Sequence, residues 1–227
     1  MILTERVEPD VHSSLEEIVH AASHAIGIVL ALLALIFLVA KAAALGGARE
    51  IAAVSIFAVS ALVLYASSTL YHGAFRSRFQ PFLETIDHSA IYIKIAGSYT
   101  PFALLVLSPI SGTTILIIVW LLAIAGITLK FLARYLTDMR KYDWLSLTGY
   151  LAMGWLGIFV IGELWAKLPL SGFAWPVAGG LCFTVGALFY AWKTRTYTHA
   201  IFHLFVLAGS VCHFVAVYGY VLPASTA

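Results

Sequence analysis

Long apolar runs, free or almost free of ionised side chains, take up most of this chain. Each run is long enough for a helix that crosses a bilayer, and backbone groups in hydrocarbon must be satisfied within the segment. The sequence therefore predicts an all-α membrane protein, a bundle of seven transmembrane helices. The predicted spans are residues 19–40, 51–71, 89–107, 113–129, 144–162, 173–192 and 200–222.

Composition leaves room for one membrane domain and no sizeable aqueous domain. Of 227 residues, 62% are hydrophobic and 11% are charged. We expect residues 1–18 to form a short cytoplasmic segment, 19–222 the bundle and 223–227 a short tail. The net charge of +2 gives no sign of nucleic-acid binding. Cys182 and Cys212 fall in apolar runs, which predicts buried thiols rather than a disulfide.

The distribution of Lys and Arg predicts the orientation of the bundle. The connections between consecutive spans are numbered from the N-terminus. Three cationic residues lie at the odd-numbered connections: Lys41, Arg49 and Lys167. Nine lie in the N-terminal segment and the even-numbered connections: Arg6, Arg76, Arg78, Lys130, Arg134, Arg140, Lys141, Lys193 and Arg195. Since cytoplasmic loops carry the excess of cations, the N-terminus is expected in the cytoplasm and the C-terminus outside.

This orientation places five polar residues at the cytoplasmic ends of three helices. His199 and His203 are four residues apart, so they share one helical face. With His72 as a third nitrogen ligand they predict a zinc site that keeps an open position. Asp87 is then the predicted base for a water molecule, and Ser68 a hydrogen-bond partner for that water or a substrate carbonyl.

Spacing alone leaves alternatives open at this end of the bundle. His20 and His24 are also four residues apart, at the cytoplasmic start of the first span, and are nearly as good a ligand pair. Asp87 has a structural alternative as an N-terminal helix cap. Ser68 also has a structural alternative, because a serine hydroxyl in a transmembrane helix commonly donates to a backbone carbonyl of its own helix.

Other ionisable residues lie deeper or at the outer end. Lys94 is seven residues past Asp87, about 10 Å deeper by helical rise, and is either a structural tether or a ligand-binding group. His213 lies about 15 Å beyond His203, too far to share its ion. Glu163 and Lys167 are expected to form a surface ion pair.

Four ordered motifs resemble the bacterial hemolysin III proteins of the progestin and adipoQ receptor family. The resemblance spans nearly the whole chain. The motifs are Glu17 with His24 and Gly27, Ser68-Thr-Leu-Tyr-His72, Asp87-His-Ser-Ala, and His199-Ala-Ile-Phe-His203.

The resemblance implies zinc on His72, His199 and His203, with Asp87 contacting the water of that site and Ser68 in the same polar cluster. It favours these ligands over His20 and His24, and it implies a multi-pass protein of the bacterial inner membrane. The wider superfamily includes alkaline ceramidases, which hydrolyse a lipid amide.

The leading hypothesis is therefore a zinc-dependent hydrolase of a lipid amide or ester, with membrane lipids as substrate or ligand and a role in membrane-lipid homeostasis. One alternative is a sensor of membrane state with structural zinc. Another is a pore-forming cytolysin.

Overall fold

The computed structural model describes residues 13–136, 143–192 and 194–225, and these form seven long helical rods without a strand. Two rods are interrupted or continued by short helices of another type. In chain order the elements are α1 (Ser14–Leu45), α2 (Ala48–Gly73), α3 (Gln80–Leu105), α4 (Pro109–Leu136), α5 (Asp143–Gly154) with the 3-10 turn Trp155–Val160 and α6 (Ile161–Lys167), α7 (Leu170–Ala191), and α8 (Thr198–Ala216) with the π-helix Val217–Val221 and α9 (Leu222–Ala224).

Six rods of the described chain are long and apolar enough to cross a membrane, which confirms the all-α membrane fold. The seventh, α3, has 26 residues, or about 39 Å of helix, but is more polar because it carries Asp87 and Lys94. Its polarity is tolerated because most of its side chains are buried by neighbouring helices rather than exposed to lipid.

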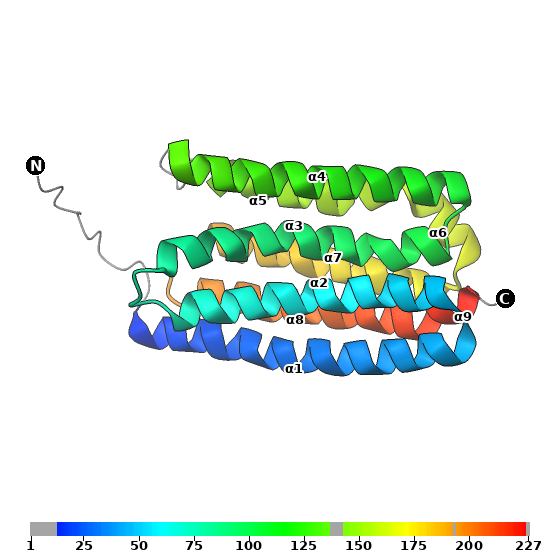
Figure 1. The fold of residues 1–227 in the computed structure, drawn as a ribbon, viewed down its shortest axis with the longest axis horizontal. Helices are drawn as coiled ribbons and strands as arrows, with labels where there is room; N and C mark the ends of the chain where they lie inside the picture. The colour runs from blue at the N-terminus through cyan, green and yellow to red at the C-terminus, as the bar shows by residue number, and fades with distance from the viewer. Residues whose placement is uncertain (1–12, 137–142, 193, 226–227) are drawn as a thin grey trace, which may run out of the picture.

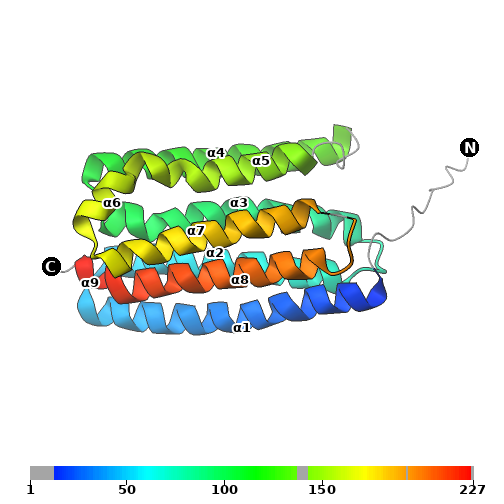
Figure 2. The ribbon, with the colours of Figure 1, turned by 180° about the vertical axis from the view of Figure 1, so that it is seen from behind.

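The rods run side by side along the whole bundle (Figures 1 and 2). Helix α1 lies along one edge, α2 and α8 come next, then α3 and α7, while α4 and α5 form the opposite edge. α1 contacts both α2 and α8, although α8 is the last long rod in the chain. This arrangement brings the starts of α1 and α8 and the end of α2 to the same end of the bundle.

Local features at this end tie α1 to α8. Ser13 caps α1 through a capping box with Glu16, whose Oε2 accepts from the Ser13 backbone N–H at 2.9 Å. The other oxygen of Glu16 accepts from the backbone N–H of Tyr197 at 2.8 Å. Tyr197 precedes α8 and has φ of 61°, a left-handed conformation that a non-glycine residue holds only when its surroundings impose it. The Glu16 carboxylate therefore helps to hold the backbone of Tyr197 at the position where α8 begins.

Close helix contacts complete the frame. A Cβ on Gly27 would lie 2.6 Å from the ring of Tyr65, so only glycine allows α1 to approach α2 this closely.

The proposed domain bounds and membrane orientation stay predictions. Four cations used for the orientation, Arg6, Arg140, Lys141 and Lys193, lie outside the described residues.

Candidate metal centre

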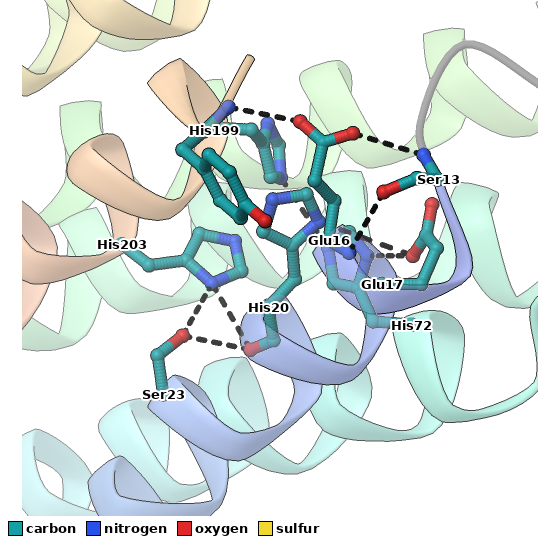
Figure 3. Close-up of polar contacts among 9 residues, drawn as sticks. Ser13, Glu16, Glu17, His20, Ser23, His72, His199 and His203 are labelled. Carbon is teal, nitrogen blue, oxygen red and sulfur yellow. Dashed lines mark hydrogen bonds and ion pairs between the residues drawn. The ribbon is translucent and has the colours of Figure 1, made fainter.

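Five histidines from three helices gather at one end of the bundle. Figure 3 shows His20, His72, His199 and His203 of this cluster. The rings of the predicted ligands are close: their centroids are 5.1 Å apart for His72 and His199, 4.6 Å for His199 and His203, and 5.2 Å for His72 and His203. His72 and His203 are fully buried, and His199 is half-buried. The structure therefore brings together the three residues that the sequence predicted as ligands.

The Nδ1 atom of His72 already has a protein partner. It lies 2.6 Å from Oε2 of Glu17, and both side chains are buried. A carboxylate that accepts at this distance takes the Nδ1–H of His72, and a neutral imidazole with Nδ1–H has its lone pair on Nε2. A carboxylate on the outer nitrogen is the usual way in which a metal-binding histidine is held.

The Nδ1 atom of His203 is held in a similar way. The Ser23 hydroxyl donates to the backbone oxygen of His20 at 2.7 Å, so its own oxygen accepts from His203 Nδ1 at 2.9 Å. The same Nδ1 lies 3.3 Å from the His20 backbone oxygen. In a neutral His203 this leaves the lone pair on Nε2.

The distance between two inner nitrogens fits a zinc ion. Nε2 of His72 and Nε2 of His199 are 3.3 Å apart. Two histidine nitrogens that bind one tetrahedral zinc, each at about 2.0–2.1 Å, are separated by about 3.3 Å. Two lone pairs at that distance repel each other unless a cation or proton lies between them, so the donor set fits the predicted metal.

The structure also adds His20, whose role the spacing left open. One nitrogen each of His20, His72 and His199 lies within 4.8 Å of the others, close enough for a metal after small shifts of the rings. His24, the other member of that pair, instead stacks on His203 with centroids 3.6 Å apart and planes 9° apart. The candidates for a third ligand are thus His20, whose nitrogen lies in this group, and His203, and His24 packs against His203.

Asp87 and Ser68 lie beside the histidines and are both buried. Asp87 is in interaction range of Ser68 and the His72 ring. It is not a helix cap, because α3 begins at Gln80, seven residues earlier. Nor does Ser68 bond its own backbone: its Oγ meets no backbone acceptor and instead lies in hydrogen-bonding range of the Asp87 carboxylate, whereas Ser67 Oγ donates to Leu64 O at 2.9 Å.

A cavity of about 300 Å³ begins at this cluster and extends between α3, α5, α7 and α8. Ser68, Asp87, His199 and His203 line its polar end, while most of the remaining wall is apolar or aromatic. The cavity therefore joins a polar end at the histidines to an apolar interior.

Sequence reasoning missed the roles of Glu16 and Ser23, and it placed Glu17 in a family motif without its contact to His72. The signal was present in part, since Glu17 and Ser23 are each three residues from His20 and therefore lie near its helical face. Nothing in the spacing shows that this face of α1 meets α2 and α8.

Fold and site together define a multi-pass helical membrane protein with a buried histidine and carboxylate cluster. The chain belongs to the haemolysin III-related family, whose profile, described as "Haemolysin-III related", matches residues 12–214.

Curated relatives cover nearly the same length. The chain is 45% identical over 205 residues to "Hemolysin-3 homolog" of Bacillus subtilis, covering 90% of this chain and 94% of that protein. It is 41% identical over 211 residues to "Hemolysin-3" of Bacillus cereus, covering 93% and 94%. A more distant relative is human "Monocyte to macrophage differentiation factor", 29% identical over 180 residues and covering 75% and 71%.

Proposed function

We propose that this protein is a zinc-dependent intramembrane hydrolase that cleaves an acyl amide or ester of a membrane lipid, in the service of lipid homeostasis in the bacterial inner membrane. The observation that carries the proposal is the 3.3 Å separation of His72 Nε2 and His199 Nε2, with His199 lining the polar end of an apolar cavity. It joins a zinc-type donor set to a space that accepts an acyl chain.

His72, His199 and His203 are the proposed ligands, because Glu17 and Ser23 hold the outer nitrogens of His72 and His203 and leave the inner ones free. When bound, the ion supplies a Lewis acid that polarises a carbonyl and acidifies a water molecule. Three protein ligands would leave room for a water molecule or a substrate oxygen on the ion.

The chain's own residues carry the proton and orient the substrate. The Asp87 carboxylate takes a proton from the attacking water while the water oxygen bonds to the acyl carbon. The same proton passes to the leaving nitrogen or oxygen as its bond to the acyl carbon breaks, which yields a fatty acid and an amine or alcohol. The buried Ser68 hydroxyl donates to the substrate carbonyl oxygen, on which charge develops.

The test uses the full chain in lipid nanodiscs, with zinc measured by mass spectrometry and fatty acid release measured from an offered ceramide and an offered acyl ester. The wild type is expected to bind zinc and release fatty acid. Asp87→Asn should keep zinc and lose release, and His203→Ala should lose both. Glu163→Gln, a control at the other end of the bundle, should match the wild type.

Two results would overturn the proposal. Equal release from the wild type and Asp87→Asn would show that the hydrolysis comes from another source. Bound zinc with no release from either substrate class would favour a metal that only ties the helix ends together, as in a sensor of membrane state.

A further inference from the structure

A second cavity, of about 250 Å³, lies between α1, α2 and α8, which run side by side in the bundle (Figures 1 and 2). Its rim consists of apolar side chains that are exposed on the surface of the bundle: Leu30, Leu33, Phe37 and Val211. Its deeper wall is also apolar but buried, and includes Phe57, Ala58 and Ala61. The cavity is therefore a groove that opens toward the hydrocarbon of the membrane, and we call it the α1–α8 groove.

Two hydroxyls interrupt this apolar wall, those of Tyr65 in α2 and Ser210 in α8. Tyr65 is 2% exposed, and both hydroxyl oxygens are buried. The two lie in hydrogen-bonding range of each other, and neither meets another hydrogen-bond partner among the described residues. One proton can bridge the pair, so the second proton has no acceptor there. Since a buried donor without an acceptor is costly, the pair suits a ligand that offers an acceptor oxygen.

Lys94 of α3 borders the same groove and adds a positive charge. Its Nζ donates to Ser98 Oγ at 2.9 Å and lies 4.8 Å from the centroid of the Phe57 ring in the groove wall. A hydroxyl proton and an ammonium both favour the negative end of a ligand dipole. A carbonyl oxygen on an otherwise apolar molecule is therefore the complementary group.

The depth of the groove limits which carbonyl can reach it. Its lining residues in α2 fall within 57–65 and those in α8 within 207–214, so each set is centred within one residue of the middle of its predicted span, 51–71 or 200–222. The hydrocarbon core is about 30 Å thick, so the ester carbonyls of glycerolipids lie about 15 Å from this level. A carbonyl at the middle of the bilayer belongs to a molecule that dissolves in hydrocarbon as a whole, and an isoprenoid quinone is of this class.

We propose that the α1–α8 groove binds the ring of an isoprenoid quinone, with one carbonyl oxygen of the ring accepting from the hydroxyl pair of Tyr65 and Ser210. The aromatic side chains of Phe37, Phe57 and Phe214 supply apolar contacts for a flat ring. The volume of about 250 Å³ suits one substituted ring, and the isoprenoid chain extends past the exposed rim into lipid. The site needs neither the metal centre nor hydrolysis, and binding involves no electron transfer.

The test compares decylubiquinone with decylbenzene, which has the same chain and an aromatic ring without oxygen atoms, bound to the detergent-solubilised full chain and counted by native mass spectrometry. The wild type should bind decylubiquinone several-fold more tightly. The double variant Tyr65→Phe/Ser210→Ala should lose most of this preference, a change of about 2- to 10-fold, which is the range for one hydrogen bond. Ser67→Ala is the matched control, because the Ser67 hydroxyl donates to Leu64 O at 2.9 Å and does not line the groove.

A steric variant locates the bound ring. Ala34→Phe places a larger side chain in the groove from α1 and should weaken the binding of decylubiquinone by at least about tenfold. It also provides the decision if the double variant does not fold. Zinc content should be unchanged in both variants, which separates this site from the proposed hydrolase centre.

Three results would overturn the proposal. Equal affinity of the wild type for both probes would show that the groove accepts any apolar ring or chain. A preference for decylubiquinone that survives in the double variant would show that the hydroxyl pair does not bind the carbonyl. Unchanged binding of decylubiquinone to Ala34→Phe would show that the ring lies elsewhere in the protein.

Discussion

Glu17 should control the affinity of the metal centre without touching the metal. Its carboxylate lies 2.6 Å from Nδ1 of His72, and the two side chains are 7% and 1% exposed. In Glu17→Gln the side chain keeps its shape, but the contact becomes a neutral hydrogen bond. The change therefore removes charge assistance while leaving the packing of α1 against α2 in place.

The magnitude follows from the contact. A hydrogen bond to a charged group contributes about 1.5–3 kcal/mol and a neutral one about 0.5–1.5 kcal/mol, so the difference is about 1–1.5 kcal/mol, or roughly tenfold in affinity. Loss of ring orientation adds to this, and supporting residues of metal sites typically change affinity by about 10–100-fold. We expect zinc to bind Glu17→Gln at least about tenfold more weakly than the wild type.

The assay is competition for zinc with a chelator of known affinity, on protein in nanodiscs. Glu163→Gln is the matched control, because Glu163 forms an ion pair of 2.8 Å with Lys167 at the opposite end of the bundle. Its melting temperature also reports any general effect of losing a carboxylate. Identical zinc affinities for Glu17→Gln, Glu163→Gln and the wild type would refute the view that Glu17 orients a metal ligand.

Three further predictions concern the cluster and its frame. His203→Ala should weaken zinc binding by more than 100-fold and His20→Ala by no more than about tenfold, measured by the same competition; the reverse order would make His20 the third ligand. Asp87→Asn should lower the rate of fatty acid release by about 100-fold or more at unchanged zinc content, and unchanged release would remove Asp87 as the base. Gly27→Ala should lower stability by about 1–3 kcal/mol in thermal melts, because its Cβ would lie 2.6 Å from an aromatic carbon of α2. Gly154→Ala, whose Cβ meets nothing within 4 Å, should be neutral or slightly stabilising, and equal losses at both positions would contradict the packing argument.

Much of the fold was predictable because the bilayer reduces the choices. An apolar segment of sufficient length must form a helix in hydrocarbon, so the order and approximate bounds of the rods follow from the sequence. Helix α3 was predicted despite Lys94, and only the structure explains its polarity: it is packed between α2, α4 and α5. The helical period also placed His199 and His203 on one face.

The sequence by itself determined the class of membrane protein, the ends of the helices at which polar residues collect, and the residue types that suit a metal. Only the tertiary structure decided which faces meet. Spacing made the pair His20 and His24 nearly as good as His199 and His203, because periodicity reports a face of a helix and says nothing about its neighbours. Since α1 packs against both α2 and α8, Glu17 contacts His72, Ser23 contacts His203, and His20 joins the cluster.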